Sequence, residues 1–502
     1  MKNVSKNHKS LARNSLLLFI AQIISAVFGI ASSVLIARII GPRIMGQYSY
    51  LIWIVSTLTA VGSLGIPNTL IKYIAEYSEG KKKDLSDAIA GNLLVLTIII
   101  GVVTTVVLFL LASFHVFPNS IQTGYFYLLA FILPLTILSS SLTAILRGKR
   151  RYQTLLYVGL ITSPVMFLMI LGTLLISPTL NGLVAYYIVN TIFSFVLLAI
   201  FARRSFSLSL VKLPKKLFHS VFKFALSVSG ILLLDQIVWS QSEVLFLGHY
   251  STPEQVAFYT VSYTLTTNVM NLFPGSILGA LMPHISALHG QENKKEIISS
   301  YQNAAKYVGI IVAALVGGGI ALASPFIYTV YGSQYSQMIP VFRILLITSG
   351  LAAIFGVTAT ILYGTTQQNI ILKTGFILSI INILLDFLII PFYGATGAAL
   401  ANGISQFIGG IIGIYLLSKR EVQFPIYVYI KIVCITIVSS LITSVLVNNV
   451  VYKNIGTILL YGTLYLFMFC ILMIITKLIE KSELSIINKI FMFKNITVKV
   501  VR

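Results

Sequence analysis

A series of apolar segments, each long enough to cross a lipid bilayer, constrains this 502-residue chain more than any other feature. A helix needs roughly 20 mostly apolar residues to span the hydrocarbon layer, where its backbone polar groups must pair within the segment. Hydrophobic residues make up 57% of the chain and charged residues only 10%. We therefore predict an all-α integral membrane protein with fourteen transmembrane helices. Their approximate cores are 15–37, 48–66, 88–111, 124–146, 153–176, 182–201, 221–247, 256–282, 304–330, 338–362, 369–390, 395–418, 425–447 and 455–476.

The basic residues indicate how these helices are oriented. The chain has 35 Lys and Arg against 13 Asp and Glu, which gives a formal net charge of +22. All of the Lys and Arg residues except Arg38, Arg43, Arg343 and Lys453 fall on the side that holds both ends of the chain. Inner loops of membrane proteins carry the excess of basic residues. We predict a multi-pass protein of the plasma (inner) membrane with both termini inside.

The same distribution argues against several other classes of protein. The basic residues form no single arm or stripe, so we expect membrane lipids as partners and no nucleic acid. The predicted loops are too short for a catalytic or nucleotide-binding domain, and the motif GxxxxGK[ST] is absent. The two cysteines, Cys434 and Cys470, have no partner at metal-ligand spacing. We predict that the chain is not an enzyme and binds no metal or organic cofactor.

Short matches between the two halves of the chain indicate an internal repeat. GPRIMGQYSY (41–50) aligns with TPEQVAFYTV (252–261), and TAILRG (143–148) aligns with TATILYG (358–364). Their order and near-constant offset predict two six-helix bundles related by a pseudo-two-fold axis along the membrane normal, an architecture that suits alternating access. The predicted parts are an N-terminal bundle, a basic cytoplasmic linker, a C-terminal bundle, and two last helices with a basic tail: 1–202, 203–220, 221–418 and 419–502.

Polar and charged residues inside the predicted spans are candidates for function, because a charge near the bilayer centre costs about 2.5 to 3.5 kcal/mol. Counted from Lys223, Asp235 lies roughly 18 Å along a helix, near the midplane, and Glu243 lies roughly 30 Å along it, at the outer edge. This separation argues against a carboxylate pair. The candidates for a substrate or ion pathway are Asp235, Gln236, Glu243, Asp386, Arg38, Arg343 and Gln22.

Helical spacing places some of these candidates on shared faces. Gln236, Ser240 and Glu243 follow at i, i+4 and i+7, and a milder stripe comprises Gln22, Ser25, Gly29, Ser32 and Ser33. We expect both stripes to line the space between the bundles, although small polar residues also mediate helix packing.

Each charged candidate has two interpretations. Asp235 couples transport to protons or Na⁺, or it forms a structural hydrogen bond or ion pair. Arg343 and Asp386 form a structural ion pair, or they belong to an outer gate or a cationic patch. Arg38 lies at the outer end of the first helix, where it can reach water.

Two stretches carry a resemblance to a known family. ARIIGPRIMGQYSYLIWIVSTLTAVGSLGIPNTLIKYIAEY (37–77) and YGATGAALANGISQ (393–406) resemble the polysaccharide-transporter branch of the multidrug/oligosaccharidyl-lipid/polysaccharide exporter superfamily. The resemblance covers the first twelve predicted helices and extends to the count of fourteen. It implies a flippase that moves a polyprenyl-phosphate- or pyrophosphate-linked oligosaccharide from the inner to the outer leaflet, with polymerases or glycosyltransferases of the same pathway as further partners.

The charges in the predicted spans depart from the cationic cavity that the resemblance implies. Asp235, Glu243 and Asp386 stand against Arg38 and Arg343. Either the headgroup is not strongly anionic, or the acids serve ion coupling or pairing. A cation-coupled multidrug exporter of the same superfamily is the main alternative function. A membrane glycosyltransferase or polymerase is a remote one, since neither a large outer loop nor a DxD-type acidic motif is predicted.

Overall fold

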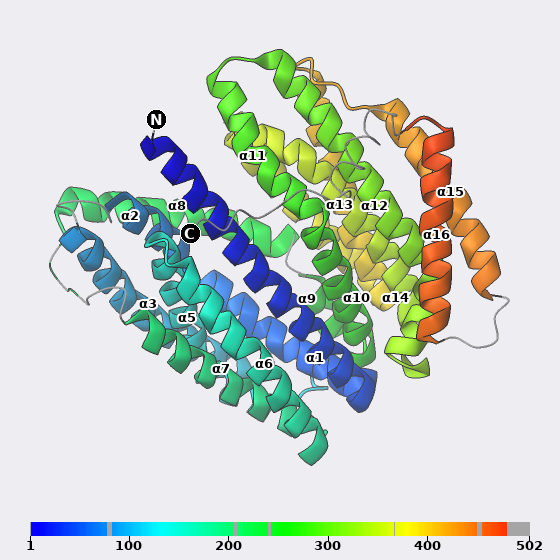
Figure 1. Cartoon of the computed structure of the whole chain (residues 1–502). Coiled ribbons are helices and arrows are strands. Elements are labelled where there is room, and N and C mark those ends of the chain that lie inside the picture. Colours follow the sequence, from blue (N-terminus) through cyan, green and yellow to red (C-terminus); the bar gives the residue numbers. More distant parts are fainter. Residues whose placement is uncertain are drawn as a thin grey trace, which may run out of the picture. The chain divides into compact units, whose positions relative to one another are not determined.

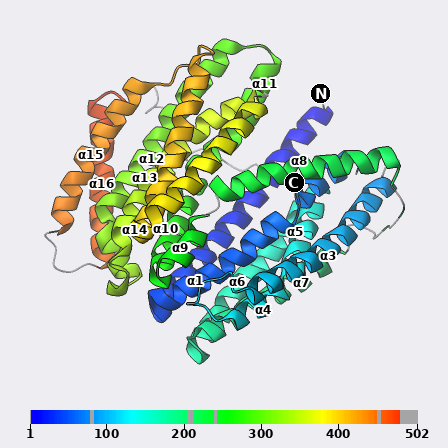
Figure 2. The same cartoon turned by 180° about the vertical axis from the view of Figure 1, so that it is seen from behind.

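A computed structural model of the chain consists of helices joined by turns and loops, with no strand, in the residues that it describes, which are 2–77, 83–203, 209, 211, 213–238, 242–365, 367–448 and 454–478 (Figures 1 and 2). In a few helical stretches, among them residues 2–22 and Asp235, only the backbone is described. The helices are α1 (Lys2–Gly62), α2 (Ile66–Tyr77), α3 (Lys83–Ser113), α4 (Thr123–Ala130), α5 (Leu133–Gly148), α6 (Tyr152–Ile176), α7 (Leu180–Ala202), α8 (Lys215–Val238), α9 (Glu243–Tyr250), α10 (Pro253–Leu272), α11 (Pro274–Gly290), α12 (Lys294–Val330), the 3₁₀ helix η2 (Ser333–Tyr335), α13 (Met338–Gly364), α14 (Gln368–Ser418), α15 (Ile426–Asn448) and α16 (Ile455–Ile475).

The chain is a multi-pass membrane protein. Among the described residues, nine helices are long and apolar enough to cross a membrane, and the bent pair α4 and α5 would make a tenth span. The 61 residues of α1 would extend about 90 Å, three times the thickness of the hydrocarbon layer, so a single crossing cannot account for this helix. The predicted count of fourteen transmembrane helices stays a prediction.

The two longest helices each contain one residue with a non-helical backbone. These residues are Gly41 in α1, with φ 80°, and Gly394 in α14, with φ 53°. Positive φ is accessible to glycine at little cost because glycine lacks a Cβ. Pro42 follows Gly41 directly, and the residue aligned with it in the predicted repeat, Pro253, is the first of α10. Both aligned prolines therefore lie directly after a break in the helical structure.

The chain divides into two compact units whose segments interleave along the sequence. Unit 1 comprises Met1–Leu272, Val330–Thr348 and Gln368–Gly409, and unit 2 comprises Phe273–Thr329, Ser349–Gln367 and Gly410–Arg502. The four-part division predicted from the repeat is a separate question and stays a prediction. Most of 204–212 in the basic linker, and the basic tail from 479 onward, lie outside the described residues.

In unit 1, α1 packs against α6 and α10, and α5 packs against α2, α3 and α7 (Figure 2). The contact between α1 and α10 is very close, because a Cβ at Gly46 would overlap the carbonyl oxygen of Pro253. Apolar residues of α2, α3 and α5, including Leu70, Ile89 and Ile145, form a buried core. Asp87 and Lys149 form an ion pair at one end of this core, with Nζ and Oδ1 2.5 Å apart.

In unit 2, α15 and α16 lie side by side and pack against α12 (Figure 1). A Cβ at Gly317 would overlap the hydroxyl of Tyr465, and the same hydroxyl donates a hydrogen bond to the carbonyl of Ala313 at 3.1 Å. The Tyr429 hydroxyl likewise donates to the carbonyl of Ala305 at 2.7 Å. Small residues on α12 therefore let two tyrosines reach its backbone.

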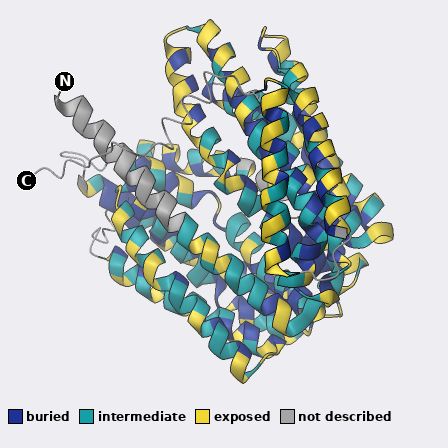
Figure 3. Ribbon diagram, turned by 45° about the vertical axis from the view of Figure 1, so that its right-hand side comes forward, coloured by how far each residue is buried: buried dark blue, intermediate teal, exposed yellow. Residues whose placement is uncertain are grey.

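The outward faces of many helices are apolar and exposed, as expected for contact with lipid. Figure 3 shows exposed positions recurring along the helices around buried ones. On α3, these exposed apolar residues include Ile99, Val102, Val103, Val106 and Leu110. A water-soluble monomer rarely exposes so large an apolar surface, whereas a bilayer covers it without cost.

Asn454 caps the N-terminus of α16 in unit 2. Its side chain accepts a hydrogen bond from the Thr457 backbone N–H at 2.9 Å, and the Thr457 hydroxyl accepts one from the Asn454 N–H at 3.5 Å. We expect Asn454→Ala to lower the free energy of unfolding by about 1 kcal/mol, because the Thr457 backbone N–H loses its side-chain acceptor. Thermal unfolding of the purified protein in detergent measures this loss, and an Asn454→Ser variant that lost as much would contradict the assigned role of the cap.

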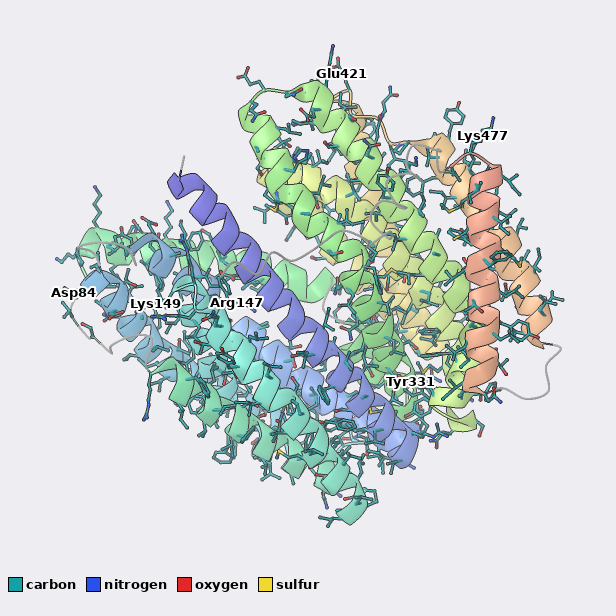
Figure 4. All side chains as sticks on the ribbon, in the orientation of Figure 1. Asp84, Arg147, Lys149, Tyr331, Glu421 and Lys477 are labelled. Carbon is teal, nitrogen blue, oxygen red and sulfur yellow. The ribbon has the colours of Figure 1, made fainter. Side chains whose placement is uncertain are left out.

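Glu421 and Lys294 form an exposed ion pair in unit 2, outside the apolar parts of the helices, and Figure 4 labels Glu421. The Lys294 ammonium donates a hydrogen bond to Glu421 and holds the pKa of this carboxyl below its usual value. Because the pKa is lower in the folded protein, the pair stabilises the fold above the unfolded-state pKa, and this contribution is lost as the pH falls through the folded-state pKa.

The melting temperatures of the wild type and of Glu421→Gln should therefore differ slightly at about pH 7 and coincide at about pH 3. Salt should reduce the difference, since the pair is exposed to water. An equal difference at both pH values would show that the ion pair is not its cause.

Candidate functional site

A cavity of about 930 Å³ lies within unit 1. Its walls come from both parts of α1 and from α6, α7, α8 and α10. The close contact at Gly46 and the break at Gly41 hold the two parts of α1 around it. The residues that line it are Ser25, Phe28, Gly29, Ser32, Ser33, Ile36, Met45, Tyr48, Ser49, Ile52, Trp53, Ser56, Ala60, Thr162, Ser163, Met166, Tyr186, Gln236, Thr260, Tyr263 and Thr264.

Hydroxyl groups and aromatic rings dominate the wall of this cavity. More than half of the described lining residues are Ser, Thr or Tyr, and the amide of Gln236 adds a further donor and acceptor. The amide of Gln236 donates to the hydroxyl of Thr57 at 3.0 Å, which ties α8 to α1. A second cavity of about 300 Å³ shares Ser56 and Ala60 with the first. Unit 1 therefore contains a continuous polar surface among membrane helices.

A second polar feature of unit 1 is a buried cluster around two carboxylates, Glu243 at the start of α9 and Asp386 in the first part of α14. Both side chains are fully buried. Asn382 lies between them, since its Nδ2 is 3.3 Å from Glu243 Oε1 and 3.0 Å from Asp386 Oδ2. The hydroxyl of Ser242 also donates to Asp386 Oδ2, at 3.3 Å. The fold therefore brings two acids into one site.

Three further residues complete the cluster. The hydroxyl of Tyr259 donates to Glu243 Oε2 at 2.8 Å, and the amide of Asn402 donates to Glu243 Oε1 at 2.8 Å. The amide of Gln406 in turn donates to the Asn402 side-chain oxygen at 2.6 Å. Asn382 and Asp386 lie four residues apart, as do Asn402 and Gln406, so each pair occupies one face of its part of α14.

The cluster has the composition of a site for a proton or a small cation. Neither carboxylate forms an ion pair with a basic residue of the described chain. Three buried oxygens have no hydrogen-bond partner there, namely Asp386 Oδ1, Asn382 Oδ1 and Gln406 Oε1. Two ionised acids in an apolar interior require a counter-charge, and oxygen ligands suit hard cations. The described residues contain no group of three or more His, Cys, Asp or Glu that would hold a transition metal.

The cavity and the cluster meet on α10. Tyr259 contacts Glu243, whereas Thr260 and Tyr263 line the cavity. The rings of Tyr259 and Tyr263 pack against each other with their centroids 5.8 Å apart. Adjacent residues of α10 therefore belong to the cluster and to the cavity wall.

The sequence model of a family described as polysaccharide biosynthesis protein matches residues 35–340, which is more than half of the chain. The chain belongs to this family. The match includes most of the residues that line the cavity, as well as Glu243.

Two curated relatives of this family member carry descriptive names. The "Probable low-salt glycan biosynthesis flippase Agl15" of Haloferax volcanii is 23% identical over 416 residues, which cover 82% of this chain and 84% of the relative. The "Capsular polysaccharide biosynthesis protein CapF" of Staphylococcus aureus is 28% identical over 169 residues, covering 32% of this chain and 40% of the relative.

Solved structures share the fold of this family member. The inward closed conformation of the lipid II flippase MurJ matches with a TM-score of 0.75 and 15% identity, over 94% of this chain and 99% of that one. An inward-facing multidrug resistance transporter of the MATE family matches with a TM-score of 0.66 and 16% identity, over 80% and 98% of the two chains. The predicted all-α, MATE-like membrane fold is thereby confirmed.

The structure corrects the predicted position of Glu243. We expected a rim residue that water solvates, at the outer end of one continuous helix. Instead Glu243 is the first residue of α9 and directly follows a turn at Ser242, so counting along one continuous helix axis does not give its depth. Its side chain is buried in the cluster and does not line the cavity, whereas Gln236 of the same predicted stripe does.

The ion pair that was one of the two interpretations of Arg343 and Asp386 is not among the described contacts of Asp386. Asp386 accepts its hydrogen bonds from Ser242 and Asn382, and its burial in the cluster with Glu243 leaves the guanidinium of Arg343 outside its contacts. Arg38 is exposed, and its guanidinium donates to the carbonyl of Val330 at 3.4 Å.

The structure describes no side chain for two of the candidate residues. The side chains of Gln22 and Asp235 lie outside the described residues, as does Ser240. The remaining members of the first stripe, Ser25, Gly29, Ser32 and Ser33, all line the cavity of unit 1.

Several residues of the site were not among the sequence candidates. Asn382, Asn402, Gln406 and Tyr259 surround the two acids, and Trp53 lines the cavity. The paired spacing of amide and acid residues inside the apolar α14 was an available signal. Neutral polar residues give a weaker signal of function than charged ones, because each costs less in a membrane than a charge does.

Proposed function

We propose that the protein translocates a polyprenyl-phosphate- or pyrophosphate-linked oligosaccharide from the inner to the outer leaflet. The observation that carries this proposal is the hydroxyl-rich cavity of about 930 Å³ among the membrane helices of unit 1, which is large enough for a saccharide headgroup. The names of the flippase and capsule relatives support the same substrate class. The headgroup would pass through the cavity during alternating access of the two predicted bundles, while the lipid tail stays in the bilayer.

The buried cluster is proposed to couple this movement to an ion gradient. Glu243 and Asp386, with the side-chain oxygens of Asn382 and Gln406, would take up H⁺ or Na⁺. The bound charge would neutralise two acids that are otherwise costly to bury in a membrane. The chain's own contribution is to hold the four oxygen-bearing side chains in place through Tyr259, Asn402 and Ser242.

The proposed location is the plasma membrane, with both termini inside. Support comes from the Lys and Arg distribution in the sequence. Figure 4 shows Asp84 and Lys149 at the same end of unit 1 and Tyr331 toward its other end. Lys149 lies beside Arg147, Arg150 and Arg151, so that end of the unit is strongly basic. Glycosyltransferases or a polymerase of the same pathway are proposed as partners.

Purified protein in liposomes tests the proposal. With a fluorescent saccharide on a polyprenyl pyrophosphate, a reductant added outside should bleach about half of the signal in empty liposomes and nearly all of it in liposomes that contain the protein. A strain that lacks the protein should accumulate lipid-linked saccharide on the inner leaflet, compared with its parent strain. Equal bleaching with and without the protein would refute the proposed function.

A second candidate function is the export of apolar cations coupled to the same ion gradient. The fold likeness to the MATE-family transporter and the two buried acids favour it. Overexpression should then raise resistance to cationic dyes, and Glu243→Gln should remove that resistance. Unchanged susceptibility on overexpression would leave the flippase as the sole candidate.

A further inference from the structure

The described part of the cavity wall in unit 1 carries no charged side chain. None of its described lining residues is Asp, Glu, Lys, Arg or His, although the chain carries 35 Lys and Arg. The two arginines predicted for the pathway are not among these residues: Arg38 is exposed and donates to the Val330 carbonyl, and Arg343 is half-buried in α13. Among the described residues, the basic side chains of the chain therefore do not line this surface.

An anion would bind poorly to such a wall. A phosphate or carboxylate that leaves water needs a cation or several charge-assisted hydrogen bonds to offset the loss of solvation. Hydroxyl groups supply only neutral hydrogen bonds. The phosphates of a lipid-linked substrate would therefore stay outside this surface, toward the lipid headgroups.

An uncharged sugar suits the wall in two respects. Sugar hydroxyls both donate and accept hydrogen bonds, and so do the side chains of Ser33, Ser49 and Thr264. The C–H faces of a pyranose ring are apolar and pack on aromatic rings, which Trp53 and Tyr263 supply. The hydroxyl of tyrosine and the indole N–H of tryptophan can also form hydrogen bonds at one end of each ring.

We infer that the cavity selects an uncharged saccharide, built of neutral hexose or N-acetylhexosamine units, and discriminates against saccharides that carry carboxylates. The inference rests on the proposed function and specifies its substrate class. Selection arises from contacts that need no charge, so binding is insensitive to salt. An acidic sugar loses affinity because its carboxylate has no cation to pair with.

Trp53 provides a direct probe of occupancy, because the chain has only two tryptophans and the other is Trp239. In the full-length Trp239→Phe protein, the emission of Trp53 should shift on titration with a neutral N-acetylhexosamine tetramer. The apparent Kd should change less than about two-fold between roughly 50 and 500 mM salt. A uronic-acid tetramer should bind at least about ten-fold more weakly, and inorganic pyrophosphate should cause no shift.

Three results would overturn the inference. The first is an emission shift by pyrophosphate or the uronic-acid tetramer at concentrations equal to or below those of the neutral sugar. The second is an affinity for the neutral sugar that falls steeply with salt. The third is no shift by the neutral tetramer at concentrations up to about 10 mM, a range that covers the weak end of specific binding.

A charge placed in the wall gives an independent test. Ser56 lines the cavities of about 930 Å³ and about 300 Å³ and is exposed, so a longer side chain has room there. Ser56→Arg should raise the affinity for the uronic-acid tetramer by about ten-fold or more, whereas the matched neutral variant Ser56→Asn should not. Equal affinities of the two variants for the acidic sugar would contradict a wall that discriminates by charge.

Translocation separates failure of this inference from failure of the proposed function. Liposomes that contain the protein should translocate a lipid-linked neutral disaccharide faster than one with a uronic acid. Equal rates for both substrates would refute the neutral specificity and retain the flippase. Translocation of neither substrate would refute the flippase, and the Trp53 titration would still report what the cavity binds.

Discussion

Replacing Glu243 by Gln is expected to lower gradient-driven translocation by about 100-fold or more, which corresponds to about 2.7 kcal/mol. The amide keeps the volume of the side chain but cannot bind a proton or a cation at neutral pH. The cluster around Asp386 then keeps only one of its two carboxylates, and the ion that is proposed to move during the cycle loses one of its ligands. Asp386→Asn should have a similar effect. Translocation of the lipid-linked saccharide in liposomes, with an imposed Na⁺ or pH gradient, measures both variants.

A second readout separates coupling from simple misfolding. If Na⁺ binds the folded protein at the cluster, the melting temperature of the wild type should rise with Na⁺ concentration, and that of Glu243→Gln should not. If transport is coupled to protons instead, the melting temperature of neither protein should depend on Na⁺. The rate of translocation by the wild type should then follow the pH gradient. The matched control is Glu292→Gln, which changes an exposed acid. A Glu243→Gln protein with wild-type gradient dependence would remove the cluster from the mechanism.

Gly46→Ala is expected to destabilise unit 1 by about 3 kcal/mol, or to prevent its folding. Gly46 is buried on α1, and the added methyl group would overlap the carbonyl oxygen of Pro253 at the start of α10. Backbone atoms cannot rotate away as a side chain does, so the two helices would have to separate. Thermal unfolding of the purified protein, followed by Trp fluorescence or circular dichroism, measures the loss.

Gly172→Ala provides the control for helix propensity. Gly172 lies in α6 with no other atom within 4 Å of an added Cβ, so alanine there should be neutral or stabilise the helix by up to about 1 kcal/mol. If Gly46→Ala melts like Gly172→Ala, the close approach of α1 and α10 does not contribute to stability.

Much of the fold followed from apolar length alone, because the bilayer admits few structures other than helices. Each predicted span overlaps helical residues, and the aligned Pro42 and Pro253 both follow a break. Breaks of a helix inside an apolar run could not be predicted as well from the sequence. The apolar run of residues 221–247 gave no sign that a new helix would begin at Glu243, directly after a turn at Ser242.

The candidate site was only partly predictable for the same reason. Gln236 and the serines of the first stripe could be assigned to a polar surface by their spacing. The contact between Glu243 and Asp386 through Asn382 could not, since it joins α9 to α14 across more than a hundred residues. The position of a residue along its own helix does not reveal which other helix supplies its hydrogen-bond partner.

The packing of Tyr259 on Tyr263 has a thermodynamic consequence for the whole cycle. If the cavity binds the headgroup as proposed, a sugar that displaces Tyr263 would also disturb the ring of Tyr259, and with it the hydrogen bond of Tyr259 to Glu243. Equilibrium linkage is reciprocal, so the factor by which headgroup occupancy changes ion affinity equals the factor by which the ion changes headgroup affinity. The gradient would then set the direction of transport by changing how tightly each conformation retains its cargo, without any contact between ion and sugar.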